Sequence, residues 1–208
     1  GPAQPDQDLE VRVEVADDEP AAALVASPPS GSEPGYVAIA LHPRLDVGDE
    51  VMARELVVVL DRSTSMRGVA MDLARATALR ALAGLGTQDT FRISTVDGPI
   101  AALGEAPLPA TSANVARAAA AIRNVNIVGT ASREGLARAL APATAADRLR
   151  VVFLATDGYL GDERDVHREI RESISDARLF AVGVGTAVNQ YLLSRLVELG
   201  RGELEIPS

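Results

Sequence analysis

The side chains with the clearest capacity for chemistry lie in three short polar stretches. LDRSTSMRG (60–68) places one carboxylate and three hydroxyls within five positions, IVGTASREGL (127–136) carries a threonine, and LATDGYLGD (154–162) carries a carboxylate followed by glycine. All of these donors are hard oxygen atoms, which favours a hard divalent cation, Mg²⁺ above all, with Mn²⁺ or Ca²⁺ as alternatives. The candidate metal ligands are Asp61, Ser63, Ser65, Thr130 and Asp157.

The charge of this donor set indicates what such a cation would do. Only two of the five candidate ligands are anionic, so the cation would keep a strong affinity for a carboxylate from outside the chain. The sequence therefore predicts a site that recognises an Asp or Glu side chain of a protein partner. Residues beside the motif could form the rim of such a binding site, and these are Arg62, Thr64, Arg67 and Arg133. The three arginines could either help to capture an acidic partner or repel the cation.

The pattern of elements predicts how the three stretches come together. From residue 55 onward, short apolar runs alternate with amphipathic stretches, which is typical of an α/β fold with a doubly wound, mostly parallel sheet flanked by helices. Ligands of such sheets bind beyond the carboxyl ends of the strands, where Asp61 and Asp157 both lie. The expected strands are 55–60, 90–96, 149–155 and 178–185, with a short edge strand after 97, and the expected helices are 68–86, 111–122, 133–140, 162–174 and 189–200.

The N-terminal part of the chain has a different pattern. LEVRVEV (9–15) alternates as a strand does, the residues from 16 to 35 are rich in turn formers and read as a loop, and YVAIAL (36–41) is a second strand. We expect residues 1–5 to be a flexible end, 6–42 a small β appendage or linker, and 43–208 the main domain. The pair Gly1-Pro2 resembles the remainder of a cleaved tag, which predicts that the natural protein continues upstream.

Composition excludes several classes of function. The 208 residues contain no cysteine, which rules out disulfides and thiolate metal sites, and no apolar run approaches the roughly 20 residues of a membrane helix. The net charge of −9 disfavours nucleic acid and anionic lipid as partners.

Taken together, the motifs resemble a known site. Asp61-x-Ser63-x-Ser65, followed by Thr130 and then Asp157-Gly158, looks like the metal-ion-dependent adhesion site of von Willebrand factor A domains, and the resemblance spans 55–206. It implies a Rossmann-like fold, with Ser63, Ser65 and Thr130 as direct ligands and Asp61 and Asp157 binding directly or through water. A Glu or Asp of the partner would complete the shell.

The sequence after Thr156 is similar to a subgroup of this family. It resembles the inter-alpha-trypsin inhibitor heavy chains and their bacterial relatives, in which a β-rich VIT domain precedes the A domain. This resemblance implies a missing upstream VIT-like domain and an extracellular, cell-surface or periplasmic location. The use of arginine for all 20 basic residues, with no lysine, indicates a bacterial source.

Two positions depart from the family pattern, because Thr64 and Val128 stand where the family usually has glycine. A side chain at Thr64 would crowd the loop or strain its backbone if that position requires a positive φ. Two other functions therefore stay open at this point. One is an assembly scaffold with a degenerate metal site, and the other is a regulatory A domain acting on an AAA+ machine.

Simpler interpretations compete with each motif taken alone. Ser63 or Ser65 could cap the following helix, Thr130 could do the same for its own helix, and Asp157 with the next glycine could be an ordinary turn. Neither His42 nor His167 is expected to be a ligand.

Enzymatic alternatives lack required residues. A haloacid dehalogenase-type phosphatase needs a second carboxylate where Ser63 stands, and a serine hydrolase needs Gly-x-Ser-x-Gly. A phosphate-binding loop of the Walker type needs a lysine, and this chain has none. We therefore expect a non-enzymatic binding module.

Overall fold

The chain forms two compact units, residues 1–51 and 52–208. The computed structural model describes residues 21–28, 34–42, 52–100, 103–129, 136–137, 140 and 147–207. In the smaller unit, β1 (Ala21–Ser27) pairs with β2 (Tyr36–His42) in an antiparallel hairpin, with Leu24 opposite Ile39. The expected strand at 9–15 lies outside the described residues.

The position of β1 corrects the sequence interpretation, which placed a loop at 16–35. AAALVAS lacks the alternation that usually identifies a strand and has a single β-branched residue, Val25, because four of its seven residues are alanine. Its strand conformation comes instead from backbone pairing with β2 along its whole length. Local propensity gave no indication of this pairing.

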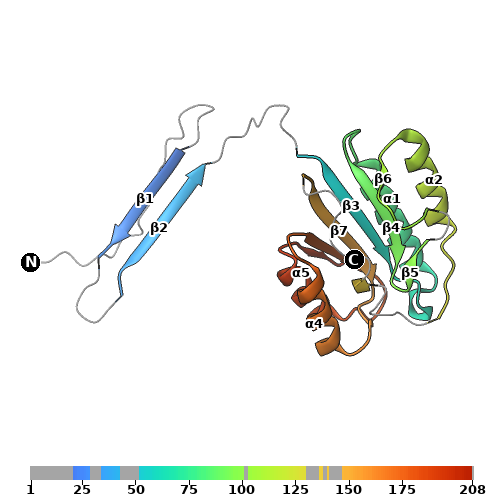
Figure 1. Cartoon of the computed structure of the whole chain (residues 1–208). Coiled ribbons are helices and arrows are strands. Elements are labelled where there is room, and N and C mark those ends of the chain that lie inside the picture. The colour runs from blue at the N-terminus through green and yellow to red at the C-terminus, as the bar shows by residue number, and fades with distance from the viewer. Residues whose placement is uncertain are drawn as a thin grey trace, which may run out of the picture. The chain divides into compact units, whose positions relative to one another are not determined.

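The larger unit is an α/β domain with a seven-stranded sheet (Figure 1). The strand order is β5-β4-β3-β7-β8-β9, with β6 also paired to β4. Pairs among β4, β3, β7, β8 and β9 are parallel, whereas β5 and β6 run antiparallel to β4. Its elements in chain order are β3 (Arg54–Leu60), the 3₁₀ helix η1 (Thr64–Met66), α1 (Val69–Ala83), β4 (Thr90–Thr95), β5 (Gly98–Pro99), β6 (Leu108–Pro109), α2 (Ser112–Arg123), β7 (Leu149–Thr156), α4 (Glu163–Ser173), β8 (Arg178–Gly183), α5 (Gln190–Leu199) and β9 (Leu204–Glu205).

The expectation of a mostly parallel sheet flanked by helices is confirmed. The central strand β3 is buried on both faces, as its continuous apolar run predicts, because successive side chains point to opposite sides. Val58 and Leu60 pack with α1 and α2 in one core, whereas Val57 and Val59 pack with α4 and α5 in the other. Figure 1 shows the two helix pairs on opposite faces of the sheet.

The helix boundaries follow their capping residues. The Thr111 hydroxyl accepts a hydrogen bond from the Asn114 N–H at the start of α2, and the Asp162 carboxylate accepts from the first turn of α4. Most of the helix expected at 133–140 lies outside the described residues. The two-residue strand β6 was not foreseen, because Leu-Pro carries no strand pattern of its own.

The connections create a switch point at the centre of the sheet. The chain leaves β3 for β4 on one side and later returns to β7 on the other, so β3 and β7 are adjacent parallel strands. Leu60 is in register with Ala155, and the Asp61 N–H donates to the Ala155 carbonyl at 2.8 Å. This arrangement brings the loops after both strands to one place at the sheet edge. In the described part of the chain, no helix has the length and apolar character needed to span a membrane.

Candidate metal site at the sheet edge

Asp61, directly after β3, is fully buried, and both of its carboxylate oxygens accept hydrogen bonds. Oδ1 accepts from the Ser63 N–H at 2.8 Å, and Oδ2 accepts from the Thr156 hydroxyl at 2.6 Å. The Thr156 oxygen in turn accepts from the Gly158 N–H at 2.9 Å. The loop after β3 and the loop after β7 are therefore joined through Asp61 and Thr156.

The two serines present their hydroxyls to each other. Ser63 Oγ and Ser65 Oγ lie 3.0 Å apart, and Ser63 is largely buried whereas Ser65 is exposed. The Ser63 side chain makes no capping hydrogen bond to η1, and α1 is preceded by Gly68. The interpretation of these serines as simple helix caps is therefore wrong, and their hydroxyls are hydrogen-bonded to each other instead.

Asp157 follows β7 in a tight turn. Its Oδ1 accepts from the Tyr159 N–H at 3.1 Å, and its carbonyl accepts from the Asn189 N–H at 2.8 Å. Gly158 has φ +89°, and a Cβ at this position would lie 2.9 Å from the Asn189 Cβ. The turn therefore requires glycine for both conformation and space. The turn interpretation of Asp157 is correct in geometry, and the same turn also sets this carboxylate beside the Asp61 loop.

The electrostatics of the site favour a cation. Burial raises the pKa of Asp61, the hydrogen bonds from Thr156 and Ser63 oppose this rise, and the negative charge of Asp157 adds to it. The two buried carboxylates therefore lie close enough to repel each other. A bound cation would stabilise the charged form of both.

The loop that carries Thr130 is described only as far as Gly129, so Thr130 itself and Arg133 lie outside the described residues. The Val128 N–H donates to the Arg62 carbonyl at 3.0 Å, which holds this loop against the loop after β3. The Val128 side chain is half exposed, and the positive φ required in this stretch falls on Gly129. The valine therefore does not strain the turn.

The expected rim residues differ in their exposure and in their contacts. The Arg62 guanidinium forms an ion pair with Asp97 (Nε to Oδ2, 2.7 Å), so it is not directed outward as an unpaired charge. Arg67 is exposed. Thr64 is also exposed, and the non-glycine residues with positive φ in the described chain are Ser175 and Arg201. The expected strain at Thr64 is therefore absent.

Two residues of the site escaped the sequence interpretation. Thr156 is the last residue of β7 and links the two loops; a hydroxyl at the end of an otherwise apolar strand was the available signal. Asn189 holds the Asp157 turn and caps α5 through its Oδ1, which accepts from the Leu192 N–H at 3.1 Å. Asparagine directly before a helical pattern was the signal for the cap, but its second contact is tertiary.

The donor set also defines which kind of metal site is available. Within the described ranges, no three His, Asp or Glu side chains gather closely enough to hold a metal ion. A metal at the switch point would therefore depend on the serine hydroxyls together with the two aspartates. Such a mixed, weakly charged oxygen set suits Mg²⁺ better than a transition metal that prefers imidazole.

Comparison with known proteins identifies the class to which this fold and site belong. Residues 54–206 match the profile of the von Willebrand factor type A domain, so the chain belongs to this family of protein-interaction modules. Human protein mono-ADP-ribosyltransferase PARP4 is 30% identical over 169 residues, covering 80% of this chain and 10% of that protein. The mouse protein of the same name is 26% identical over 151 residues, covering 73% of this chain and 8% of that protein. This chain thus spans about a tenth of the length of these relatives.

Solved structures show the same fold at low sequence identity. A von Willebrand factor type A structure from Catenulispora acidiphila has a TM-score of 0.67 and 19% identity, covering 93% of this chain and 43% of that one. The pilus adhesin SpaC from Lactobacillus rhamnosus GG has a TM-score of 0.57 and 14% identity, covering 76% of this chain and 28% of that one. At these identities the likeness concerns the fold alone.

Proposed function

We propose that this chain is a metal-dependent protein-binding module. A divalent cation held by Asp61, Ser63, Ser65 and Asp157, together with Thr130, completes its coordination shell with an Asp or Glu carboxylate of a partner protein. The observation that carries this proposal is the convergence of two serine oxygens and two aspartates at the switch point between β3 and β7. Membership of the von Willebrand factor A family supports it.

The spacing of the serine oxygens is compatible with Mg²⁺ as the cation. Neighbouring ligands of an octahedral Mg²⁺ with bonds of about 2.0–2.1 Å lie about 2.8–3.0 Å apart, and equatorial ligands of a pentagonal-bipyramidal Ca²⁺ with bonds of about 2.3–2.6 Å lie about 2.7–3.1 Å apart. The Ser63 and Ser65 oxygens are 3.0 Å apart. The same spacing also makes a hydrogen bond, so Mg²⁺ would replace one favourable contact by another without a movement of the loop.

The two aspartates have different roles in this proposal. Asp61 is fully buried and both of its oxygens are occupied, so it supplies charge, shapes the serine loop and contacts the cation through water. Asp157 has one oxygen, Oδ2, without a hydrogen bond among the described residues, and this atom faces the cation directly or through one water.

We further propose that the chain itself is not an enzyme. The name of its PARP4 relatives describes a transferase, but the match covers about a tenth of those proteins. The degenerate-scaffold alternative loses support because Thr64 causes no backbone strain. Assignment to the inter-alpha-trypsin inhibitor-like subgroup, a bacterial source and an extracellular or surface location stay predictions.

Calorimetric titration of Mg²⁺ into chelator-treated protein tests the metal site. We expect one saturable site that is lost in Asp157→Ala and retained in Asp176→Ala, an exposed aspartate in the turn before β8. Because a binding event can be thermally silent, the melting temperature is measured in parallel with and without Mg²⁺. If the wild-type protein shows no binding heat and no rise in melting temperature with Mg²⁺, the proposal is refuted.

A further inference from the structure

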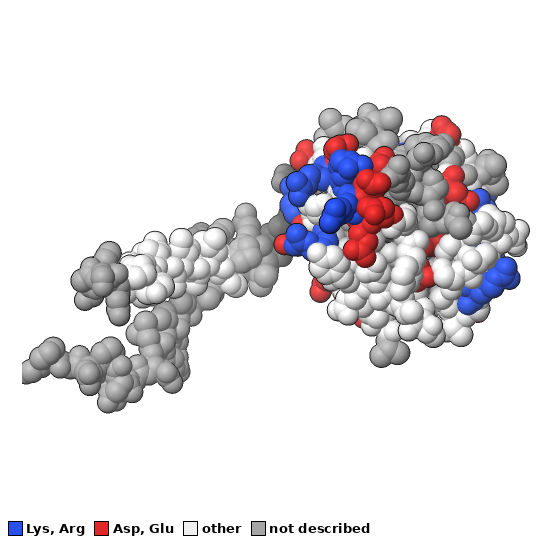
Figure 2. Space-filling view, turned by 90° about the horizontal axis from the view of Figure 1, so that it is seen from below, with Lys and Arg blue, Asp and Glu red and all other residues white. Residues whose placement is uncertain are grey.

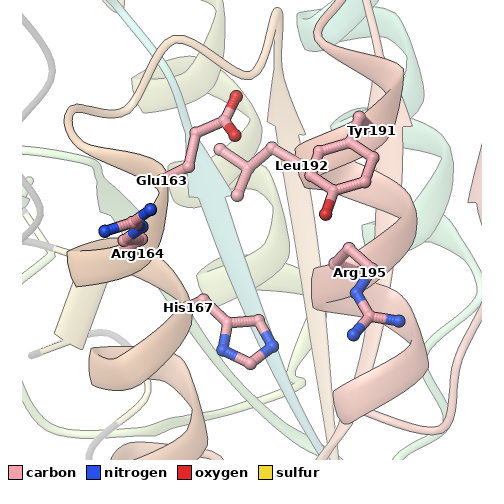
Figure 3. Close-up of a pocket in the computed structure, with 6 residues that line it drawn as sticks. All are labelled: Glu163, Arg164, His167, Tyr191, Leu192 and Arg195. Atoms are coloured by element: carbon pink, nitrogen blue, oxygen red, sulfur yellow. The ribbon is translucent and has the colours of Figure 1, made fainter.

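A cleft lies between the first turns of α4 and α5, with a volume of about 340 Å³. Figure 3 shows side chains of both helices around it, with the buried Leu192 reaching in from α5. The lining residues are Glu163, Arg164, His167, Tyr191, Leu192 and Arg195. The cleft thus has an apolar floor and polar walls.

Several hydrogen-bond donors in this cleft are unused. Among the described residues, Arg164, the half-buried His167 and the exposed Tyr191 have no hydrogen bond or ion pair from their side chains. Arg195 pairs with the exposed Glu198 at 2.8 Å. Unused donors of the guanidinium, imidazole and phenol type around one cavity suit an acceptor-rich anion such as a carboxylate.

The only acidic group of the lining is held away from these donors. The Glu163 Oε1 accepts from the Asn189 Nδ2 at 2.7 Å, and in Figure 3 this carboxylate lies at the opposite end of the cleft from His167 and Arg195. Because Glu163 is bound to Asn189, the end of the cleft at His167 and Arg195 is lined by hydrogen-bond donors and not by this carboxylate.

The cleft is directly connected, through Asn189, to the Asp157 turn of the proposed metal site. Asn189 donates its backbone N–H to the Asp157 carbonyl at 2.8 Å and its side-chain amide to Glu163 at 2.7 Å, and its Oδ1 caps α5. A single residue therefore contacts the Asp157 turn, α4 and α5. A partner segment bound at the metal would therefore need to pass only over Asn189 to reach the cleft.

We propose that the α4–α5 cleft binds a second acidic side chain of the same partner segment whose first carboxylate completes the metal shell. The partner is then an acidic peptide segment with two carboxylates, one for the metal and one for Arg164, His167 and Arg195. Its methylene groups would contact Leu192. This inference rests on the proposed function, because it extends the footprint of that same site.

The charge of the chain bears on where an acidic segment could bind. With a net charge of −9, the chain as a whole repels an acidic segment, so positive groups must be concentrated where the segment binds. In Figure 2, several Arg side chains lie next to a group of acidic side chains on the face of the larger unit that is seen from below. The cleft itself contributes two guanidinium groups, Arg164 and Arg195, and one carboxylate, Glu163.

Peptide selection tests the inference. Random peptides displayed on phage are selected on the wild-type protein in Mg²⁺, and the affinities of synthetic versions are measured with and without EDTA. We expect acidic peptides whose affinity falls by about tenfold or more in the double variant Arg164→Glu, Arg195→Glu. Arg171→Glu, an exposed charge on α4 outside the cleft, is the matched control and should leave affinity unchanged.

A direct readout uses the imidazole signals in the proton NMR spectrum, since the chain has two histidines. The selected peptide should shift the resonance that is lost in His167→Gln and leave the His42 resonance in place. Unchanged Mg²⁺ binding by the double variant excludes an indirect effect through the metal loop.

The outcomes separate the two proposals. Peptides that require Mg²⁺ but bind the double variant normally would overturn the cleft and leave the metal-dependent function standing. Peptides that bind equally in EDTA would overturn the metal-dependent function, and with it the shared footprint. Failure to select any peptide would count against both.

Discussion

Thr156→Val gives the sharpest test of how the proposed metal site is built. This substitution keeps the shape of a fully buried side chain and removes the 2.6 Å hydrogen bond that Thr156 donates to Asp61, as well as the acceptor for the Gly158 N–H. A hydrogen bond to a charged group contributes about 1.5–3 kcal/mol. Groups that orient a metal-binding side chain change metal affinity by about 10–100-fold. We therefore expect Mg²⁺ affinity to fall by about that factor and the free energy of unfolding to fall by about 2 kcal/mol.

Calorimetric titration and urea unfolding measure the two effects, and two variants control them. Thr156→Ser restores the hydroxyl and should recover most of the affinity. Thr95→Val removes a hydroxyl that is also buried at the end of a strand, but that donates to the neutral Gly98 carbonyl at 2.9 Å. It should cost about 1 kcal/mol of stability without affecting Mg²⁺. Normal Mg²⁺ affinity in Thr156→Val would refute the idea that Thr156 organises the site through Asp61.

Two further predictions concern stability. Burial raises the pKa of the Asp89 carboxyl, but hydrogen bonds from Arg54 and Gly86 outweigh burial and hold that pKa below its usual value. The charged Asp89 therefore stabilises the fold at neutral pH, and this stabilisation is lost as the pH falls through the lowered pKa. Asp89→Asn should therefore lower the free energy of unfolding by about 2 kcal/mol at pH 7, and the difference from wild type should shrink in acid; an equal difference at both pH values would contradict this. Gly158→Ala should destabilise the protein by about 1–3 kcal/mol and weaken Mg²⁺ binding, because it strains the turn against Asn189. Gly104→Ala, with a similar φ of +77° but open space around its Cβ, should retain Mg²⁺ binding, as calorimetry would show.

The parallel sheet and the two aspartates were predictable because their signals are local. A continuous apolar run can be buried on both faces only in a covered sheet, and a polar residue directly after such a run must lie at the strand end. Asp61 and Asp157 meet these conditions, and the structure places both at the switch point. For Ser63 and Ser65, sequence reasoning left a cap and a ligand open, and hydrogen-bond geometry was needed to exclude the cap.

What escaped prediction depends on contacts between distant segments. The strand β1 is alanine-rich and is defined by its pairing with β2. Thr156 and Asn189 act through partners that no local pattern reveals, since Asn189 reaches both Asp157 and Glu163. Whether Thr64 needs a positive φ was left open for a related reason: the backbone places the positive φ of this region on Gly68, four residues later.

The bond between Thr156 and Asp61 joins residues that are 95 positions apart in the chain. Closing so long a segment is entropically costly, so the two halves of the site meet only when the central strands β3 and β7 have paired. A cation that requires both halves can stabilise the native state but has little to hold before that pairing occurs. Such a cation should therefore mainly slow unfolding and leave the folding rate nearly unchanged, because it binds only after the fold has formed.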